Sequence, residues 1–246
     1  MFDCVELANA TRNIVCRDEK RSYYRFRPAR FYGGIATGDC VGCCLRCVFC
    51  WSWREVANPE RYGSMCAPEE VAEKLVTIAK RKGFRQIRIS GNEPTIGRRH
   101  LISLLGLIPM EYVFILETNG ILLGHDEAYA EELSRFPNLR VRVSLKGACE
   151  EEFSRLTGAR PEGFGLQLRA LENLVNHGVR ANPACMVSFS SVESIEKLKV
   201  RLGRIGFEDF EVEELVLYPA AEERLKKLGI RHGVSHEPSC IPPEQI

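Results

Sequence analysis

Five cysteines lie within eleven residues of this chain, in the segment DCVGCCLRCVFCW, and they are Cys40, Cys43, Cys44, Cys47 and Cys50. Thiolates at such close spacing are typical ligands of iron–sulfur clusters. Three of them can bind three irons of a four-iron cluster, which leaves the fourth iron open to a substrate or cofactor. The segment therefore predicts chemistry at the cluster and not only electron storage.

Two sets of three cysteines share the same spacing. The first set is Cys43, Cys47 and Cys50. The second set is Cys40, Cys44 and Cys47. We favour the first set, because aromatic Phe49 precedes its last cysteine where the second set has Arg46, and because the second set starts nearer to the end of the preceding strand. A structural zinc site is an alternative, but such sites pair two CxxC-like halves, and the sequence shows no second half.

The composition predicts one α/β domain with a substantial core. The chain has 246 residues, 45% of them hydrophobic and 27% charged, with a formal net charge of +1. This balance predicts no nucleic-acid or membrane partner. No apolar stretch approaches the roughly 20 residues that span a bilayer, and the N-terminal segment lacks a signal-peptide pattern, so a cytoplasmic location is expected. Clustered thiols, 11 cysteines in all, indicate metal ligands or redox groups rather than disulfides.

Strands and helices are expected to alternate after about residue 30. Strands are predicted at 29–37, 84–90, 111–117, 139–145, 179–189 and 210–219. Helices are predicted at 67–82, 98–107, 126–135, 164–178, 192–203 and 221–229. Six such units favour a parallel sheet with helical crossovers, a partial (βα)6 open TIM-like barrel, since eight are needed for closure.

The ends of the chain are less regular. A single domain is predicted over 1–246. Residues 1–28 form an N-terminal extension, expected to hold a helix and a solvated basic stretch. Residues 230–246 form a loose C-terminal tail, because Gly233 and three prolines prevent the helix that would bring His232, His236 and Cys240 onto one face. The cysteines outside the loop are expected to be buried free thiols.

Polar or glycine-containing segments follow four successive strands. The cysteine loop follows the first strand, SGNEPT (90–95) the second, ETNG (117–120) the third and SLK (144–146) the fourth. In parallel α/β folds, functional sites gather at the carboxyl ends of the strands. We therefore expect these four segments to face one rim.

These motifs resemble the signature of the radical S-adenosylmethionine (radical SAM) superfamily. The cysteine motif has the family's spacing, GNEP (91–94) is similar to its GGEP motif, and ETNG is similar to the third strand of the subgroup around pyruvate formate-lyase activating enzyme. The resemblance covers about residues 29–219. It implies that Cys43, Cys47 and Cys50 ligate a [4Fe–4S] cluster whose fourth iron is chelated by SAM. Reductive cleavage of SAM would give methionine and a 5′-deoxyadenosyl radical, which abstracts hydrogen from a substrate.

The resemblance also implies a SAM pocket. Gly91, Asn92 and Glu93 would meet the SAM ammonium, and Asn92, in place of the second glycine, tolerates a left-handed backbone. The backbone of Phe49 would contact adenine. Ser144, in place of the subgroup's usual aspartate, would lie near the ribose, and Lys146 would pair with the carboxylate. Further pocket residues are Pro94, Thr118, Asn119, Met186 and Ser188. No catalytic side chain is assigned.

Three functional hypotheses follow. The first is a radical SAM enzyme acting on a protein, as glycyl-radical activating enzymes do, because a short chain leaves the barrel mouth wide. The second is modification of a small metabolite or nucleobase. The third, a non-enzymatic Fe–S electron carrier, predicts four cysteine ligands and leaves GNEP, ETNG and SLK unexplained. Either enzyme needs SAM and an electron donor such as a ferredoxin or flavodoxin.

Overall fold

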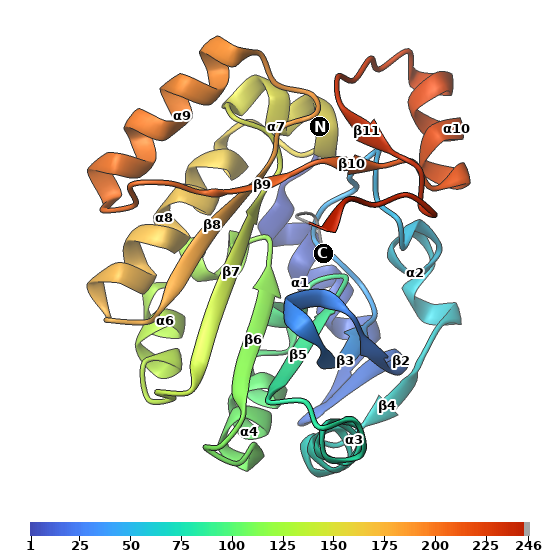
Figure 1. Cartoon of the computed structure of the whole chain (residues 1–246), viewed down its shortest axis with the longest axis vertical. Coiled ribbons are helices and arrows are strands. Elements are labelled where there is room, and N and C mark those ends of the chain that lie inside the picture. Colours follow the sequence, from blue (N-terminus) through green and yellow to red (C-terminus); the bar gives the residue numbers. More distant parts are fainter. Residues whose placement is uncertain (244–246) are drawn as a thin grey trace.

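Six parallel strands joined by helices form the centre of the computed structural model, which describes residues 1–243 (Figure 1). The strands are β3 (Ile35–Cys40), β5 (Gln86–Gly91), β6 (Val113–Thr118), β7 (Leu139–Leu145), β8 (Ala181–Met186) and β9 (Glu211–Glu213). They pair in chain order, and the sheet does not close on itself. The predicted open, partial (βα)6 barrel is therefore confirmed.

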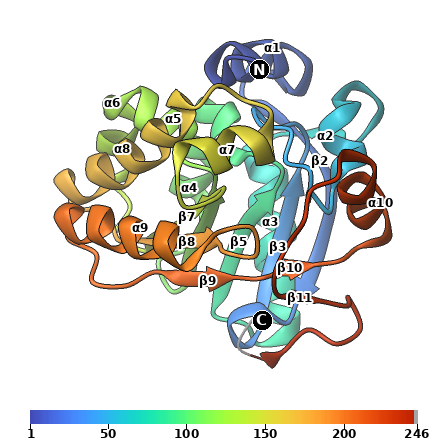
Figure 2. The same ribbon diagram turned by 90° about the horizontal axis from the view of Figure 1, so that it is seen from above.

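Helices cover the outer face of this sheet (Figure 2). They are α3 (Pro68–Lys82), α4 (Arg98–Leu107), α5 (Ile121–His125), α6 (Glu127–Leu133), α7 (Glu150–Thr157), α8 (Glu162–Asn176) and α9 (Val192–Ile205). Helix α3 starts at Pro68, where the Glu70 carboxylate accepts a hydrogen bond from Ala67 N at 2.7 Å, and it ends at Gly83 in the left-handed conformation. The short helices α5 and α7 were not predicted from the sequence.

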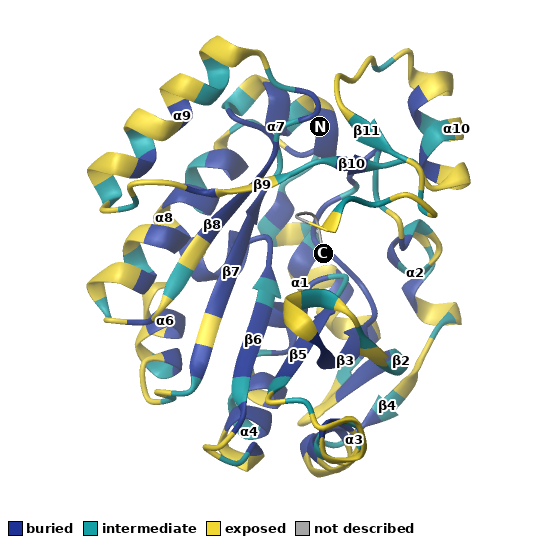
Figure 3. Cartoon of the chain, viewed as in Figure 1, coloured by how far each residue is buried: buried dark blue, intermediate teal, exposed yellow. Residues whose placement is uncertain are grey.

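The two faces of the sheet differ in chemistry. Apolar side chains that alternate along the strands pack with those of the covering helices in one core, and Figure 3 colours much of β5, β6 and β7 as buried. The fully buried ones include Ile87, Ile89, Phe114, Leu116, Val141 and Val143. Because strand side chains alternate between faces, the intervening residues line the concave inner face. That inner face is polar, and it lies below the rim where the strands end.

The N-terminal edge differs from the prediction. Helix α1 (Cys4–Val15) is present, but β2 (Lys20–Ala29) then runs antiparallel to β3 and also pairs with β1 (Cys16–Arg17) and β4 (Ser64–Cys66). The predicted strand 29–37 was therefore wrong in its first half. Residues Phe31–Gly33 form a 3-10 turn, η1, in which Tyr32 has a positive φ of 54°. The basic stretch is not fully solvated either, because Arg21 is buried.

The C-terminal part also differs. The predicted strand 210–219 is split into β9 and β10 (Leu215–Val216), and β10 pairs with β11 (Ser235–His236) in a separate small sheet beside α10 (Pro219–Leu228). His236 also contacts Glu214 at 2.5 Å. The prediction of a loose tail is therefore wrong for these residues, and 244–246 lie outside the described part of the chain. Within residues 1–243, no helix has the length and apolar character needed to cross a bilayer.

Candidate active site

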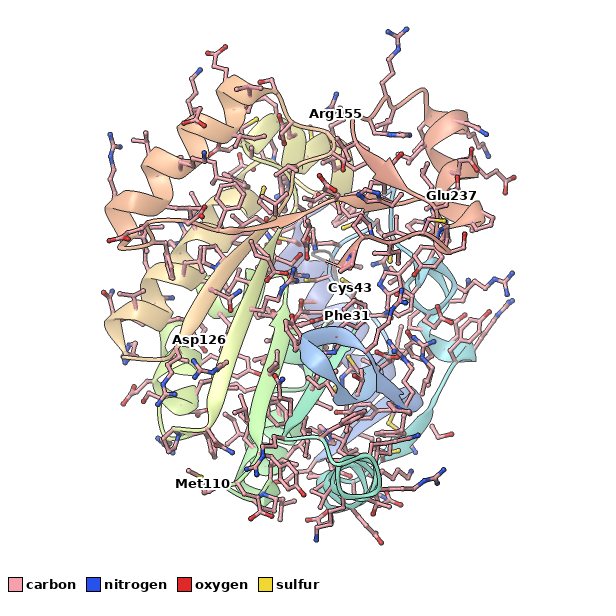
Figure 4. All side chains as sticks on the ribbon, viewed as in Figure 1. Phe31, Cys43, Met110, Asp126, Arg155 and Glu237 are labelled. Carbon is pink, nitrogen blue, oxygen red and sulfur yellow. The ribbon has the colours of Figure 1, made fainter. Side chains whose placement is uncertain are left out.

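The cysteine loop follows β3 at the rim, where Figure 4 places Cys43 near the carboxyl ends of the central strands. Short helical turns follow the loop at α2 (Trp53–Ala57) and η2 (Pro59–Arg61). Backbone hydrogen bonds tie the loop to the end of α7, from Arg46 N to Thr157 O at 3.1 Å and from Val48 N to Leu156 O at 2.9 Å. The loop is thus held by the barrel wall.

The three cysteines of the favoured set are neighbours and are poorly exposed. Cys43 and Cys47 are each 9% exposed, and Cys50 is half-buried. Burial raises the pKa of Cys47 and of Cys50, while the Lys146 ammonium partly offsets the effect on Cys47. Binding as thiolates needs positive charge to offset that burial, and iron supplies it.

The donor set consists of three thiols, which are typical ligands of iron–sulfur clusters. Among residues 1–243, no three Cys, His, Asp or Glu side chains converge closely enough for one metal ion. Ligands of a four-iron cluster bind separate irons and need not converge in this way. The three thiols could therefore hold a [4Fe–4S] cluster, each on its own iron.

The remaining cysteines of the loop have other contacts. Cys40 is fully buried in β3, its thiol donates to Ser90 O at 3.3 Å, and burial raises its pKa to about 12. Cys44 is also fully buried, beside Asn119. A Cys40 thiol that is used within the sheet favours Cys43, Cys47 and Cys50 as the ligand set.

The GNEP segment closes against the cysteine loop. Gly91 has a positive φ of 93°, and a Cβ there would lie 2.7 Å from Cys40 N. Gly91 is therefore the residue with a left-handed backbone. Asn92, which was expected to tolerate such a backbone, does not have a positive φ. The Asn92 side chain instead accepts from Gly42 N at 2.6 Å and donates to Ser52 Oγ at 2.8 Å. Asn92 thus ties both ends of the cysteine loop together.

Glu93 is fully buried, and its carboxylate accepts hydrogen bonds from neighbouring protein groups. Oε1 accepts from Thr95 N at 3.1 Å, Thr95 Oγ1 at 2.7 Å and Thr118 Oγ1 at 2.6 Å, and Oε2 accepts from Asn119 N at 2.7 Å. Pro94 then begins the 3-10 turn η3 (Pro94–Gly97). A carboxylate accepts about four hydrogen bonds, so this use differs from the predicted contact with the SAM ammonium. Glu93 joins the ends of β5 and β6.

Ser144 and Lys146 share the inner face of β7. Lys146 Nζ donates to Ser144 Oγ, which donates to Glu213 Oε2 at 2.8 Å. Burial would raise the pKa of Glu213, but the charges of Arg142 and Lys146 outweigh it and bring the pKa to about 2. Glu213 is thus ionised and holds Ser144, and through it Lys146, at the rim. No motif in the sequence indicates Glu213, which lies on a strand of three residues.

An apolar wall borders the cysteine loop. The Phe49 ring stacks on Phe189 with centroids 5.4 Å apart, and Met186 packs in the same cluster. Ser188 lies beside them, but its hydroxyl accepts from Leu215 N at 2.8 Å. The structure therefore brings Phe49, Met186 and Ser188 together, with the Ser188 hydroxyl already bonded.

Ion pairs that sequence reasoning missed line the inner face below the rim. Arg88 pairs with Glu117 at 2.8 Å, and Arg142 pairs with both Glu213 and Glu211 at 2.6 Å. The sequence does contain a pattern that indicates these charged residues, because charged residues alternate with apolar ones in FRQIRIS and LRVRVSL. An alternating strand normally has one solvated face, but in a barrel that face points into the interior.

Two further residues support the site from outside the rim. Arg224 of α10 donates from Nε to Val48 O at 3.1 Å and from Nη2 to Cys50 O at 2.5 Å. Gln167 of α8 is fully buried and donates to Asn119 O at 2.5 Å and to Ser144 O at 3.1 Å. Both bond to backbone groups far away in the chain, so no sequence motif indicates them.

A protein-family model and several curated proteins match this chain. The model of the family described as "Radical SAM superfamily" matches residues 39–199. A GTP 3′,8-cyclase from Syntrophomonas wolfei is 35% identical over 158 residues, which are 63% of this chain and 47% of that protein. A probable GTP 3′,8-cyclase from Methanosarcina mazei is 25% identical over 247 residues, or 91% of this chain and 72% of that protein. The chain thus spans about half the length of the first of these relatives.

Solved structures share the fold. Streptococcus suis SuiB bound to S-adenosylmethionine superposes with a TM-score of 0.59 at 18% identity, covering 83% of this chain and 52% of that one. Native anSMEcpe with bound AdoMet superposes with a TM-score of 0.57 at 21% identity, covering 78% of this chain and 61% of that one.

The predicted placement near pyruvate formate-lyase activating enzyme is not supported, because the curated relatives are named GTP 3′,8-cyclase. The family match covers most of the chain and its rim motifs, and the chain belongs to the radical SAM superfamily, whose members use a [4Fe–4S] cluster and SAM.

Proposed function

We propose that this chain is an enzyme that cleaves SAM reductively at a [4Fe–4S] cluster and abstracts hydrogen from a small polar substrate of the purine nucleotide class. The observation that carries the substrate class is similarity to proteins named GTP 3′,8-cyclase, in one case over 91% of this chain. This is the small-molecule alternative of the sequence analysis. The protein-substrate hypothesis rested on the short chain and on the activating-enzyme resemblance, and it has lost the second of these supports.

Cys43, Cys47 and Cys50 would hold the cluster, which supplies the electron that breaks a C–S bond of SAM. The backbone of Gly91, at the end of β5, would meet the SAM ammonium, and glycine is needed there because a Cβ would lie 2.7 Å from Cys40 N. Lys146 lies near Cys47 and would pair with the SAM carboxylate.

The wall of Phe49 and Met186 would pack against the adenine ring. Thr118 and Asn119, at the end of β6, border the same rim. The electron donor, for which a ferredoxin or flavodoxin is expected, and the cytoplasmic location both stay predictions from the sequence.

The polar inner face supports a polar substrate. Arg88 and Arg142 are buried below the rim and pair with Glu117 and Glu213, so the interior next to the rim is charged rather than apolar. A purine base and its ribose offer complementary donors and acceptors, whereas an apolar substrate would desolvate these charges without replacing their hydrogen bonds.

Transfer of deuterium tests the substrate class. The reconstituted, reduced protein is incubated with SAM and ribose-deuterated GTP, with deuterated ATP and a deuterated glycine-containing peptide in parallel. Deuterium in 5′-deoxyadenosine from GTP or ATP, measured by mass spectrometry, supports a purine nucleotide. Deuterium from the peptide alone would sink this proposal and restore the protein-substrate hypothesis.

A further inference from the structure

The side-chain amide of Asn119 lies against the sulfurs of two adjacent cysteines. Its Nδ2 is 3.7 Å from Cys43 Sγ and 3.2 Å from Cys44 Sγ. A primary amide carries two N–H donors, so each sulfur can accept one. A thiolate is a stronger acceptor than a thiol, and the hydrogen bond to Cys43 therefore strengthens when that residue binds iron.

The orientation of this amide is fixed by its other contacts. Asn119 Oδ1 accepts from Ile121 N at 3.0 Å at the start of α5 and from Cys44 Sγ at 3.7 Å. The bond from Ile121 N identifies the oxygen of the amide, so the nitrogen is the atom beside Cys43. The backbone N of Asn119 donates to Glu93 at 2.7 Å, and its carbonyl accepts from Gln167 at 2.5 Å. Asn119 is only 5% exposed. Contacts from three directions thus hold a buried donor beside the cysteine loop.

We propose that Asn119 is a positioning residue that raises the reduction potential of the cluster by donating a hydrogen bond to the sulfur of Cys43. The inference rests on the proposed function, in which Cys43 is a cluster ligand. Reduction adds one electron to the cluster and makes its sulfurs more negative. A hydrogen-bond donor at a ligand sulfur stabilises that state more than the oxidised one. Asn119 therefore makes it easier for an electron donor to reduce the cluster.

A potentiometric titration of the reconstituted protein, followed by electron paramagnetic resonance, tests this role. Asn119→Ser keeps a short acceptor for Ile121 N but cannot reach the sulfur. Asn173→Ser is the matched control, since its amide donates to Leu123 O at 2.8 Å at the far end of the same helix, α5. We expect Asn119→Ser to lower the equilibrium constant for reduction of the cluster roughly tenfold, which lowers its reduction potential by about 59 mV for one electron. Iron content and the potential of Asn173→Ser should match the wild type.

The outcomes separate the two proposals. A wild-type protein that assembles no cluster would defeat the proposed function, and a Cys43→Ala variant that still holds a [4Fe–4S] cluster would defeat the assignment of Cys43 as a ligand. A wild-type potential in Asn119→Ser, or an equal shift in Asn173→Ser, would overturn the role of Asn119 alone. If Asn119→Ser holds no cluster, Asn119→Thr decides, because its hydroxyl keeps an acceptor for Ile121 N, while it lacks the N–H donor and adds no charge. A lowered potential in Asn119→Thr supports the role, and an unchanged one refutes it.

Discussion

Glu213 gives the sharpest prediction about the stability of the site. Its carboxylate accepts from Arg142 at 2.6 Å and from Ser144 at 2.8 Å, in the interior of the barrel. A pKa of about 2, against an ordinary 4.5, corresponds to about 3 kcal/mol of stabilisation at neutral pH. Removal of one partner from a buried ion pair costs about 3–5 kcal/mol. We therefore expect Glu213→Gln to lower the free energy of unfolding by about 3 kcal/mol at pH 7.

The pH dependence has a definite sign. The native pKa is below that of the unfolded chain, so this stabilisation is complete above about pH 4.5. It is lost as the pH falls toward 2, because the native carboxylate then takes up its proton. Glutamine does not titrate, so the difference between the wild type and Glu213→Gln should shrink over this range.

Urea denaturation of the apoprotein, followed by circular dichroism between pH 7 and pH 3, measures both effects. Glu211→Gln is the matched control, because Glu211 contacts the same Arg142 but its side chain is 43% exposed, against 19% for Glu213. Exposed ion pairs contribute about 1 kcal/mol or less. Equal costs for the two variants, or a cost of Glu213→Gln that does not change with pH, would refute the reasoning.

Three further predictions concern single residues. Gly91→Ala puts a Cβ 2.7 Å from Cys40 N at a φ of 93°, and we expect a loss of about 2 kcal/mol or more, measured as a lower Tm. Arg224→Ala removes two hydrogen bonds to carbonyls of the cysteine loop. The reconstituted variant should release iron to a chelator faster than the wild type, and Lys226→Ala, on the same helix, should not. Burial lowers the pKa of His100 to about 4 from 6.5, so urea titrations should show about 3 kcal/mol lost as the pH falls from 6.5 to 4, with no such loss in His100→Gln.

Local patterns predicted the repeating part of the fold. The alternation in LRVRVSL gives β7 with its observed bounds, Leu139–Leu145, and the predicted helix 98–107 matches α4. These elements carry their own signal, because the period of apolar residues follows from the geometry of a strand or a helix. The four rim segments were placed correctly for the same reason, since each follows a strand that could be recognised.

Contacts between distant residues were not predictable in the same way. Gln167 and Glu213 gain their roles only when α8 packs against β7 and β9 pairs with β8, and their partners are more than 20 residues away. The turn at Phe31–Gly33 looked like part of a strand, because the positive φ of Tyr32 has no signature in the sequence. The break between β9 and β10 was missed because residues 210–218 contain no glycine, proline or other typical turn residue that would mark it. These misses follow from tertiary packing, which local propensity does not encode.

Production of 5′-deoxyadenosine tests the central claim most directly. The protein is reconstituted anaerobically with iron and sulfide, reduced with dithionite, given SAM and analysed by chromatography. We predict that the wild type and Cys40→Ala both form 5′-deoxyadenosine and that Cys43→Ala does not. Product from Cys43→Ala at the wild-type level, or its loss in Cys40→Ala with the fold intact, would contradict the assignment of Cys43, Cys47 and Cys50 as the cluster ligands.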